Sequence, residues 1–152
     1  MWFNNTNTVS CAIKHTNGNI WFGTYGNGIS IIKPQTKKIK QLKNQLPNLT
    51  ISNICFAENN IVYISTLGGG LIKAKIDEND NLTIIKTYTE EDGLGSDYVY
   101  ATILDNANTL YVASDGGGLQ ILLKNKFFSI TKKYKLNSNT VTSLCKDNNN
   151  AI

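Results

Sequence analysis

Carboxylates that could perform acid–base chemistry gather in one short stretch of this chain. Glu90, Glu91, Asp92 and Asp97 follow one another closely. A glycoside hydrolase needs two carboxyl groups that face each other across a bound sugar, and neighbours on one loop seldom reach that geometry. The sequence offers no second cluster as a facing partner, so we expect no catalytic residue and no enzyme activity in this chain.

A polar stretch and a histidine offer two further candidates. Asp77-Glu78-Asn79-Asp80-Asn81 carries oxygen ligands of the kind that calcium prefers, but it lacks the Gly and the terminal Glu of an EF-hand loop. His15 stands beside Asn17 and Gly18, with no Ser or Cys to complete a catalytic triad. We expect the polar stretch to be a hairpin tip and His15 to be a turn residue.

The three cysteines, Cys11, Cys55 and Cys145, show no metal-binding spacing. None lies in a Cys-x-x-Cys pair, and a single histidine leaves no zinc pattern. Each falls inside an apolar stretch, so we expect small buried side chains. The sequence indicates no metal and no cofactor.

Glycines cluster at turns rather than in a phosphate loop. The stretches 26–28 and 68–70 lack the Gly-Lys-Ser/Thr ending of such a loop, and they lead into β-forming residues instead of a helix. We interpret them as hairpin turns, in which glycine readily takes a positive φ.

These glycines belong to a tandem repeat. The repeated pattern is aromatic, apolar, small, Ser/Thr, any residue, Gly, any residue, Gly and Ile/Leu. Its copies begin at Trp21, Tyr63 and Tyr111. A second, apolar pattern keeps the same spacing. Its copies begin at Val9, Ile51, Val99 and Val141. Two patterns that hold one phase indicate a structural repeat, and the aromatic residue is expected to pack between neighbouring units.

Each repeat unit predicts four strands, because short runs of β-forming residues alternate with Gly, Asn and Asp turns. The expected strands are 9–13, 20–24, 29–32 and 39–42, then 51–55, 61–66, 71–76 and 83–89, then 99–103, 110–114, 119–123 and 127–133. A further first strand is expected at 141–145.

Four short strands per unit, in tandem, are typical of β-propeller blades. We predict an all-β fold, a β-propeller fragment of about three four-stranded antiparallel blades plus the first strand of a fourth. The predicted blades are 9–49, 50–97 and 98–139, and the next begins in 140–152. Propellers close with about four to eight blades. The outer faces of this segment are therefore expected to need the remaining blades or another copy of the chain as partner.

Charge and hydropathy exclude other partners. The net charge of +4 comes from lysines without any arginine, and the lysines lie in stretches expected to form outer strands. A nucleic-acid surface would cluster Arg and Lys with aromatic residues. The N-terminus does not have the pattern of a signal peptide, and no apolar stretch is long enough to span a membrane. We expect neither nucleic-acid nor membrane contact within this segment.

Two stretches match a known repeat closely. Residues 20–24 read Ile-Trp-Phe-Gly-Thr before Gly-Asn-Gly-Ile at 26–29, and residues 88–99 carry a Gly-Leu-Gly-Ser-Asp linker. They resemble the two-component regulator propeller family, whose repeats contain Leu-Trp-Ile-Gly-Thr, Gly-Gly-Leu and Gly-Leu-Pro-Ser-Asn. The departures are Tyr63 and Tyr111 in place of Trp, and a shortened linker at 46–48.

The resemblance implies a sensory role. In proteins of this family such blades form paired propellers in the extracytoplasmic part of hybrid sensor histidine kinases, and these often sense glycan fragments. It implies a periplasmic segment of a phosphorelay protein whose kinase lies outside this chain. The alternatives are a propeller that acts as a protein–protein interaction scaffold and a carbohydrate-active enzyme propeller.

Loops at one end of the predicted disc could converge on a ligand. The turn between the second and third strands shares that end with the linker into the next first strand. The candidate ligand-binding residues there are Tyr25, Asn27, Leu67, Asp97, Tyr98 and Asp115. Aromatic rings with amides and carboxylates suit an oligosaccharide, through stacking and hydrogen bonds to hydroxyl groups. The alternative is that these residues only form exposed turns.

Overall fold

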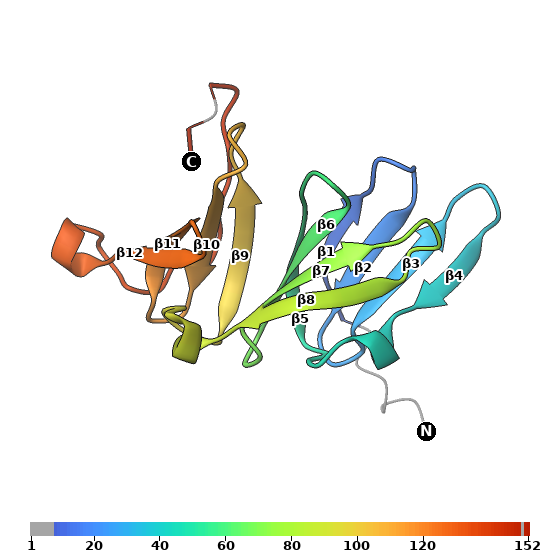
Figure 1. Ribbon diagram of the computed structural model, residues 1–152, viewed down its shortest axis with the longest axis horizontal. Helices are drawn as coiled ribbons and strands as arrows, with labels where there is room; N and C mark the ends of the chain where they lie inside the picture. The colour runs from blue at the N-terminus through green and yellow to red at the C-terminus, as the bar shows by residue number, and fades with distance from the viewer. Residues whose placement is uncertain (1–7, 150) are drawn as a thin grey trace.

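Three antiparallel sheets make up the computed structural model of the protein, which describes residues 8–149 and 151–152 (Figure 1). Each sheet contains four strands that are consecutive in the chain, in the orders β1-β2-β3-β4, β5-β6-β7-β8 and β9-β10-β11-β12. This arrangement confirms the predicted propeller-type fold of three four-stranded blades.

The strands lie close to their predicted positions. They are β1 (Val9–Lys14), β2 (Ile20–Thr24), β3 (Ile29–Lys33), β4 (Lys38–Gln41), β5 (Ile51–Phe56), β6 (Ile61–Thr66), β7 (Leu71–Ile76), β8 (Leu82–Tyr88), β9 (Val99–Leu104), β10 (Leu110–Ser114), β11 (Gly118–Leu123) and β12 (Lys126–Ile130). Short 3₁₀ helices follow the last strand of each sheet: η1 (Lys43–Gln45), η2 (Glu90–Asp92) and η3 (Lys132–Tyr134). The predicted strand 127–133 was therefore too long, because η3 begins two residues after β12 ends.

Neighbouring sheets pack face to face through two apolar clusters. Trp21 from β2 is fully buried, and its ring meets Phe56 of the second sheet edge-on, with centroids 5.3 Å apart. Tyr63 lies in the cluster between the second and third sheets, together with Val112. The expected role of the aromatic residue thus holds for these two sheets. Tyr111 is only half-buried, because no further sheet covers its face in the part of the chain described.

A β-bulge at the start of each first strand links one sheet to the next. The strand register shifts between Val9 and Cys11, and the equivalent shift occurs in β5 and in the pairing of β9 with β10. In the first two sheets the residue at the bulge is a serine. Ser10 Oγ donates to the Ile51 carbonyl and Ser52 Oγ donates to the Val99 carbonyl, each at 2.5 Å. A bulge re-aims a side chain, and here it turns a hydroxyl toward the next blade.

Residues 141–145 take the place of a first strand without forming a ladder. The Gly118 N–H donates to the Asn139 carbonyl, just as Gly70 donates to Asp97 and Gly28 to Leu49 in the earlier units. The Val141 N–H donates to Ser114 at the end of β10. The segment is therefore in register, but no second strand pairs with it among the described residues.

The prediction of buried cysteines holds only in part. Cys11 and Cys55 are half-buried, and burial raises the pKa of both thiols. Cys145 is exposed, contrary to expectation, because no sheet covers the segment 141–145 in the part of the chain described. All three are free thiols.

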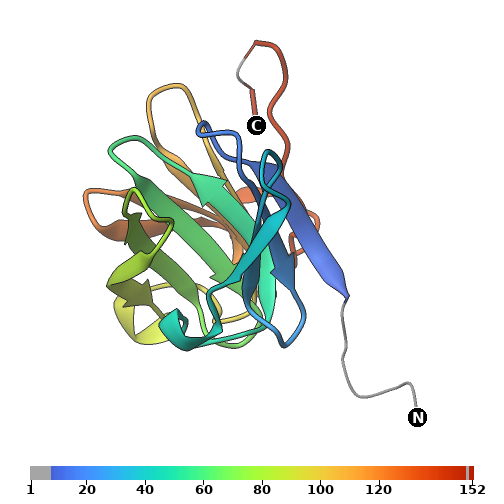
Figure 2. The ribbon, with the colours of Figure 1, turned by 90° about the vertical axis from the view of Figure 1, so that its right-hand side faces the viewer.

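The two ends of the stacked sheets are of different kinds. The turns between the first and second strands rise at the top of Figure 1, whereas the glycine turns and the linkers between sheets lie at its bottom. Figure 2 looks onto the sheet of β1–β4 from the side away from the other sheets. On that face a hollow of about 340 Å³ is lined by Val9, Phe22, Ile32 and Lys43, among others.

Candidate functional site

The glycine-turn end forms a continuous rim, defined here as Tyr25, Thr50, Leu67, Tyr98 and Asp115. Tyr25 bridges to Thr50 and Leu67 bridges to Tyr98, as isolated antiparallel pairs. The Leu67 N–H also donates to the Thr50 carbonyl at 3.0 Å, and the Asp115 N–H donates to the Tyr98 carbonyl at 3.0 Å. The main chain thus places Tyr25, Leu67, Tyr98 and Asp115, four of the six candidate residues, in one hydrogen-bonded path that crosses all three sheets.

Linker carbonyls hold the glycine turns against this rim. The Gly68 and Gly70 N–H groups both donate to the Asp97 carbonyl, at 3.0 and 2.9 Å. Gly70 has a φ of 74°, and a Cβ there would collide with the Tyr88 carbonyl oxygen. Only glycine fits this turn, because it alone tolerates both the positive φ and the close approach of the backbone. The glycine turns are therefore structural hairpins, as predicted.

Three candidate side chains form hydrogen bonds with other residues of the chain. Asp97 Oδ1 accepts from the Glu90 N–H at 2.9 Å, while Glu90 Oε1 accepts from the Asp97 N–H at 3.3 Å. Asp115 Oδ1 accepts from the Thr140 hydroxyl at 2.9 Å. Asn27 Oδ1 accepts from Lys43 Nζ at 2.8 Å. These polar groups order the turns and the linkers, so a ligand would meet them already oriented.

The exposed aromatic rings at the rim are the groups best suited to contact a ligand. Tyr25 is 42% exposed and Tyr98 is 54% exposed. The Tyr98 ring lies against the turn at Gly68, where a Cβ would be 3.5 Å from Tyr98 Cζ. A tyrosine presents a large flat surface at low entropic cost and carries a hydroxyl for hydrogen bonding.

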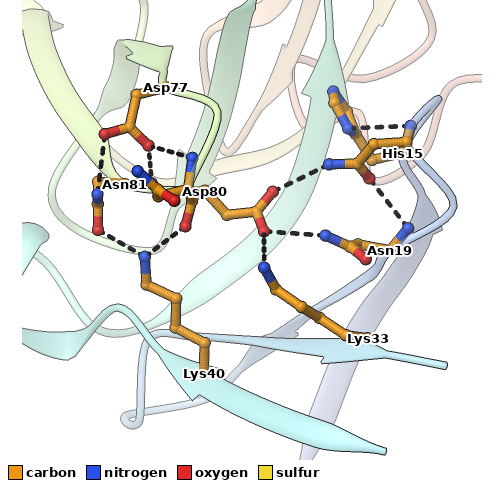
Figure 3. Close-up of polar contacts among 9 residues, drawn as sticks. His15, Asn19, Lys33, Lys40, Asp77, Asp80 and Asn81 are labelled. Atoms are coloured by element: carbon orange, nitrogen blue, oxygen red, sulfur yellow. Dashed lines mark hydrogen bonds and ion pairs between the residues drawn. The ribbon is translucent and has the colours of Figure 1, made fainter. Parts of the chain in front are cut away.

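Sequence reasoning missed a polar junction between the first and second sheets, drawn in Figure 3. Asp80, in the β7–β8 turn, is 1% exposed and lies 3.1 Å from Lys33 Nζ of β3. Its two carboxylate oxygens also accept from Asn17 at 3.1 Å and Asn19 at 2.9 Å. A buried carboxylate is tolerated when it is paired and hydrogen-bonded. Asn17 and Asn19 lie 63 and 61 residues from Asp80 in the chain, so no local pattern in the sequence indicated this junction.

Asp77 organises the same turn from within. Its carboxylate accepts from the Asn79 and Asn81 N–H groups and from the Asn81 amide, and the Asn81 side chain is the largest cause of its lowered pKa. Lys40 Nζ donates to the Asn79 carbonyl and to Asn81 Oδ1. The lysine ammonium group therefore binds two oxygen atoms that could otherwise have been ligands of a calcium ion. The stretch is a hairpin tip, as expected, and no cluster able to hold a metal ion occurs in the described chain.

A second unpredicted feature lies at the opposite end of the sheets. A hollow of about 510 Å³ opens between the turns that join the first and second strands, and Lys146 also lines it. The other lining residues that matter below are His15, Phe56, Glu58 and Asp105. The sequence predicted only that His15 is a turn residue, and nothing in the types of these residues indicated a shared hollow.

Comparison with known proteins identifies the repeat. Residues 4–26 match the sequence model described as the two component regulator propeller. This stretch is therefore similar in sequence to a two component regulator propeller repeat. The matched stretch includes Trp21 and the Gly23-Thr24 pair, the same residues that suggested the resemblance. No curated protein sequence matches the chain.

Solved structures show that the fold of this chain recurs in extracellular domains. The extracellular domain of BT4673 from B. thetaiotaomicron, described as a hybrid two component system, matches with a TM-score of 0.79 and 14% identity over 99% of this chain. That of BT3049 from the same organism gives 0.76 and 22% over 99%. This chain spans only 22% and 21% of those chains.

An enzyme also shares the fold. Virginiamycin B lyase from Staphylococcus aureus matches with a TM-score of 0.60 and 20% identity, over 84% of this chain and 43% of that one. At these identities the likeness concerns the fold alone, since one propeller fold supports many functions. Among the described residues, no helix has the length and apolar character to cross a membrane.

Proposed function

We propose that this chain is a non-catalytic, ligand-recognising segment of the extracytoplasmic sensor propeller of a two-component signalling protein. The observation that carries the proposal is the regulator propeller repeat at residues 4–26. The similarity in fold to extracellular domains of BT4673 and BT3049 supports it. The kinase of such a protein would lie outside this segment, and the chain would contribute blades to a larger propeller.

The ligand surface in this proposal is the rim at the glycine-turn end. Tyr25 and Tyr98 offer exposed rings on one hydrogen-bonded path, and Asn27, Asp97 and Asp115 are held in fixed orientations beside the turns. Flat rings beside ordered amides and carboxylates can stack on a pyranose and bond its hydroxyl groups. An oligosaccharide is therefore the ligand class that we propose.

The proposal is tested by titrating a panel of neutral oligosaccharides against the chain and recording melting temperature and binding heat. Binding to one member should raise the melting temperature, because a ligand that binds only the folded state stabilises it. Tyr25→Ala and Tyr98→Ala should each weaken that binding about three- to tenfold, the scale of one aromatic contact. Tyr134→Ala is the matched control, since Tyr134 is also exposed but lies in η3. No shift with any oligosaccharide would contradict the proposal.

The uncovered faces of the first and last sheets favour a second candidate function, that of a scaffold that binds other protein surfaces. The hollow on the outer face of β1–β4 is lined in part by Val9, Phe22 and Ile32, and Val9 is 55% exposed. On the last sheet Phe128 is 53% exposed. Apolar patches of this kind mark interaction surfaces. In this proposal further blades or another copy of the chain cover them, and sedimentation velocity at several concentrations tests whether the chain associates with itself.

A further inference from the structure

The hollow at the polar-turn end has the dimensions of a ligand site. Its volume of about 510 Å³ falls within the roughly 300–1,000 Å³ usual for small-molecule pockets. All three sheets contribute to its wall: His15 follows β1, Phe56 ends β5, and Asp105 follows β9. It opens at the end of the sheets opposite the rim of Tyr25 and Tyr98, so it is a separate feature.

An aromatic pair forms part of its wall. The His15 and Phe56 rings are 4.5 Å apart and meet nearly edge to face, at 64°. Phe56 packs in turn against the fully buried Trp21, which fixes its position. His15 Nδ1 lies 3.5 Å from the Asn17 N–H that donates to it. The apolar part of the wall is therefore held from behind by the core.

Two opposite charges that line the hollow, Lys146 and Glu58, have no charged partner among the described residues. Lys146 Nζ donates to two neutral oxygen atoms, the Asn106 side-chain oxygen at 3.1 Å and the Leu104 carbonyl at 3.4 Å. The ion pairs found among the described residues are Lys33–Asp80 and Lys86–Asp92, so neither Lys146 nor Glu58 takes part in one.

Asp105, the other carboxylate in the wall, also has no ion pair among the described residues, but the protein supplies hydrogen bonds to both of its oxygens. It accepts from the Thr109 and Ala107 N–H groups at 2.8 and 2.9 Å and from the Tyr111 hydroxyl at 3.4 Å. Its role is to order the β9–β10 turn. Among the described residues the Glu58 carboxylate accepts no such hydrogen bond, so Glu58 and Lys146 are the two charges that we assign to a ligand.

We propose that this hollow binds a small zwitterion of the α-amino acid type. The ligand carboxylate pairs with Lys146, the ligand ammonium pairs with Glu58, and the ligand side chain rests against Phe56. A simple anion would pair with Lys146 but be repelled by Glu58 and Asp105, and a simple cation would pair with Glu58 but be repelled by Lys146. Hydrogen bonds between charged partners are about twice as strong as neutral ones, so a ligand with both charges gains most.

The experiment uses three probes of one shape. L-phenylalanine carries both charges, N-acetyl-L-phenylalanine lacks the ammonium group, and L-phenylalanine amide lacks the carboxylate. We expect L-phenylalanine to bind in isothermal titration and each analogue to bind about tenfold more weakly or worse, the scale of one charged hydrogen bond. Equal affinity for all three probes, or no binding of L-phenylalanine, overturns the proposal.

Two variants assign the charges. Lys146→Met should remove the preference for L-phenylalanine over its amide, and Glu58→Gln should remove the preference over the N-acetyl form. Lys126→Met and Glu91→Gln, which lie outside the hollow in β12 and η2, should leave both preferences unchanged. Preferences that survive in Lys146→Met and Glu58→Gln would refute the assignment.

The site is independent of the proposed saccharide rim. Tyr25→Ala and Tyr98→Ala should weaken saccharide binding and leave amino acid binding unaltered. Failure of the rim proposal therefore does not affect this one, and loss of amino acid binding in the tyrosine variants would contradict the placement of the site in the hollow.

Discussion

Lys33 Nζ lies 3.1 Å from the carboxylate of Asp80, and this ion pair joins strand β3 of the first sheet to the β7–β8 turn of the second. Asp80 is 1% exposed, whereas the Lys33 side chain is 37% exposed. The pair therefore fixes the junction of two blades at their outer corner, where the apolar core between the sheets ends. Removing the lysine leaves the carboxylate buried with only the Asn17 and Asn19 amides.

We expect Lys33→Met to lower the free energy of unfolding by about 1–3 kcal/mol, less than for a fully buried pair because water screens the exposed lysine. Urea denaturation followed by circular dichroism measures this change. Lys38→Met is the matched control, because Lys38 is exposed on the neighbouring strand β4. An equal effect of the two substitutions would show that the pair contributes nothing specific.

The hydrogen bond from Ser52 Oγ to the Val99 carbonyl is a second blade-to-blade contact. Ser52→Ala removes the donor and should cost about 0.5–1.5 kcal/mol of unfolding free energy, the usual net value of one hydrogen bond. Ser143→Ala, at an exposed position in the segment 141–145, should change stability by much less. Denaturant midpoints at constant m-value provide the measurement, and unchanged stability in Ser52→Ala would argue against this link.

Gly70 and Gly93 separate two costs of adding a side chain. Both have a positive φ, 74° and 89°, but a Cβ at Gly93 meets no atom within 4 Å, while one at Gly70 meets the Tyr88 carbonyl. Gly93→Ala should cost about 1–2 kcal/mol from backbone strain alone. Gly70→Ala should cost clearly more, because the strand β8 must also move. Thermal melts of the two variants test this order, and the reverse order would contradict the close approach at Gly70.

The strands could be predicted because the same residue pattern recurs in each repeat unit. β2, β6, β7 and β10 lie at their predicted bounds, since a Gly, Asn or Asp turn residue lies within two residues of each end of these strands. The end of β12 could not be predicted, because Thr131 to Lys133 are compatible with a strand and only the 3₁₀ turn of η3 decides otherwise. The strand propensities of these residues alone do not show that the 3₁₀ turn is preferred over a longer strand.

In the candidate site, too, some features could be predicted from the sequence and others could not. The end of the sheets that carries Tyr25 and Tyr98 follows from strand order, which the repeat supplies. Whether these residues bind a ligand stays a prediction. The contacts of Asp80 and the hollow beside Lys146 depend on how blades pack against one another, a relation between distant residues that no single repeat encodes.

Acid should weaken the turn between β9 and β10 through Asp105. Hydrogen bonds, first that from the Thr109 N–H, hold the pKa of this carboxyl below its ordinary value of 3.8. The folded state therefore binds the proton less readily than the unfolded state, so the contribution to stability is complete above about pH 4 and is lost as pH falls through the folded pKa. Asp105→Asn should flatten the fall in urea midpoint below pH 4. Tyr111→Phe should retain most of that fall, because the Tyr111 hydroxyl is the least of the causes. An unaltered acid profile in Asp105→Asn would assign the loss of stability to other carboxylates.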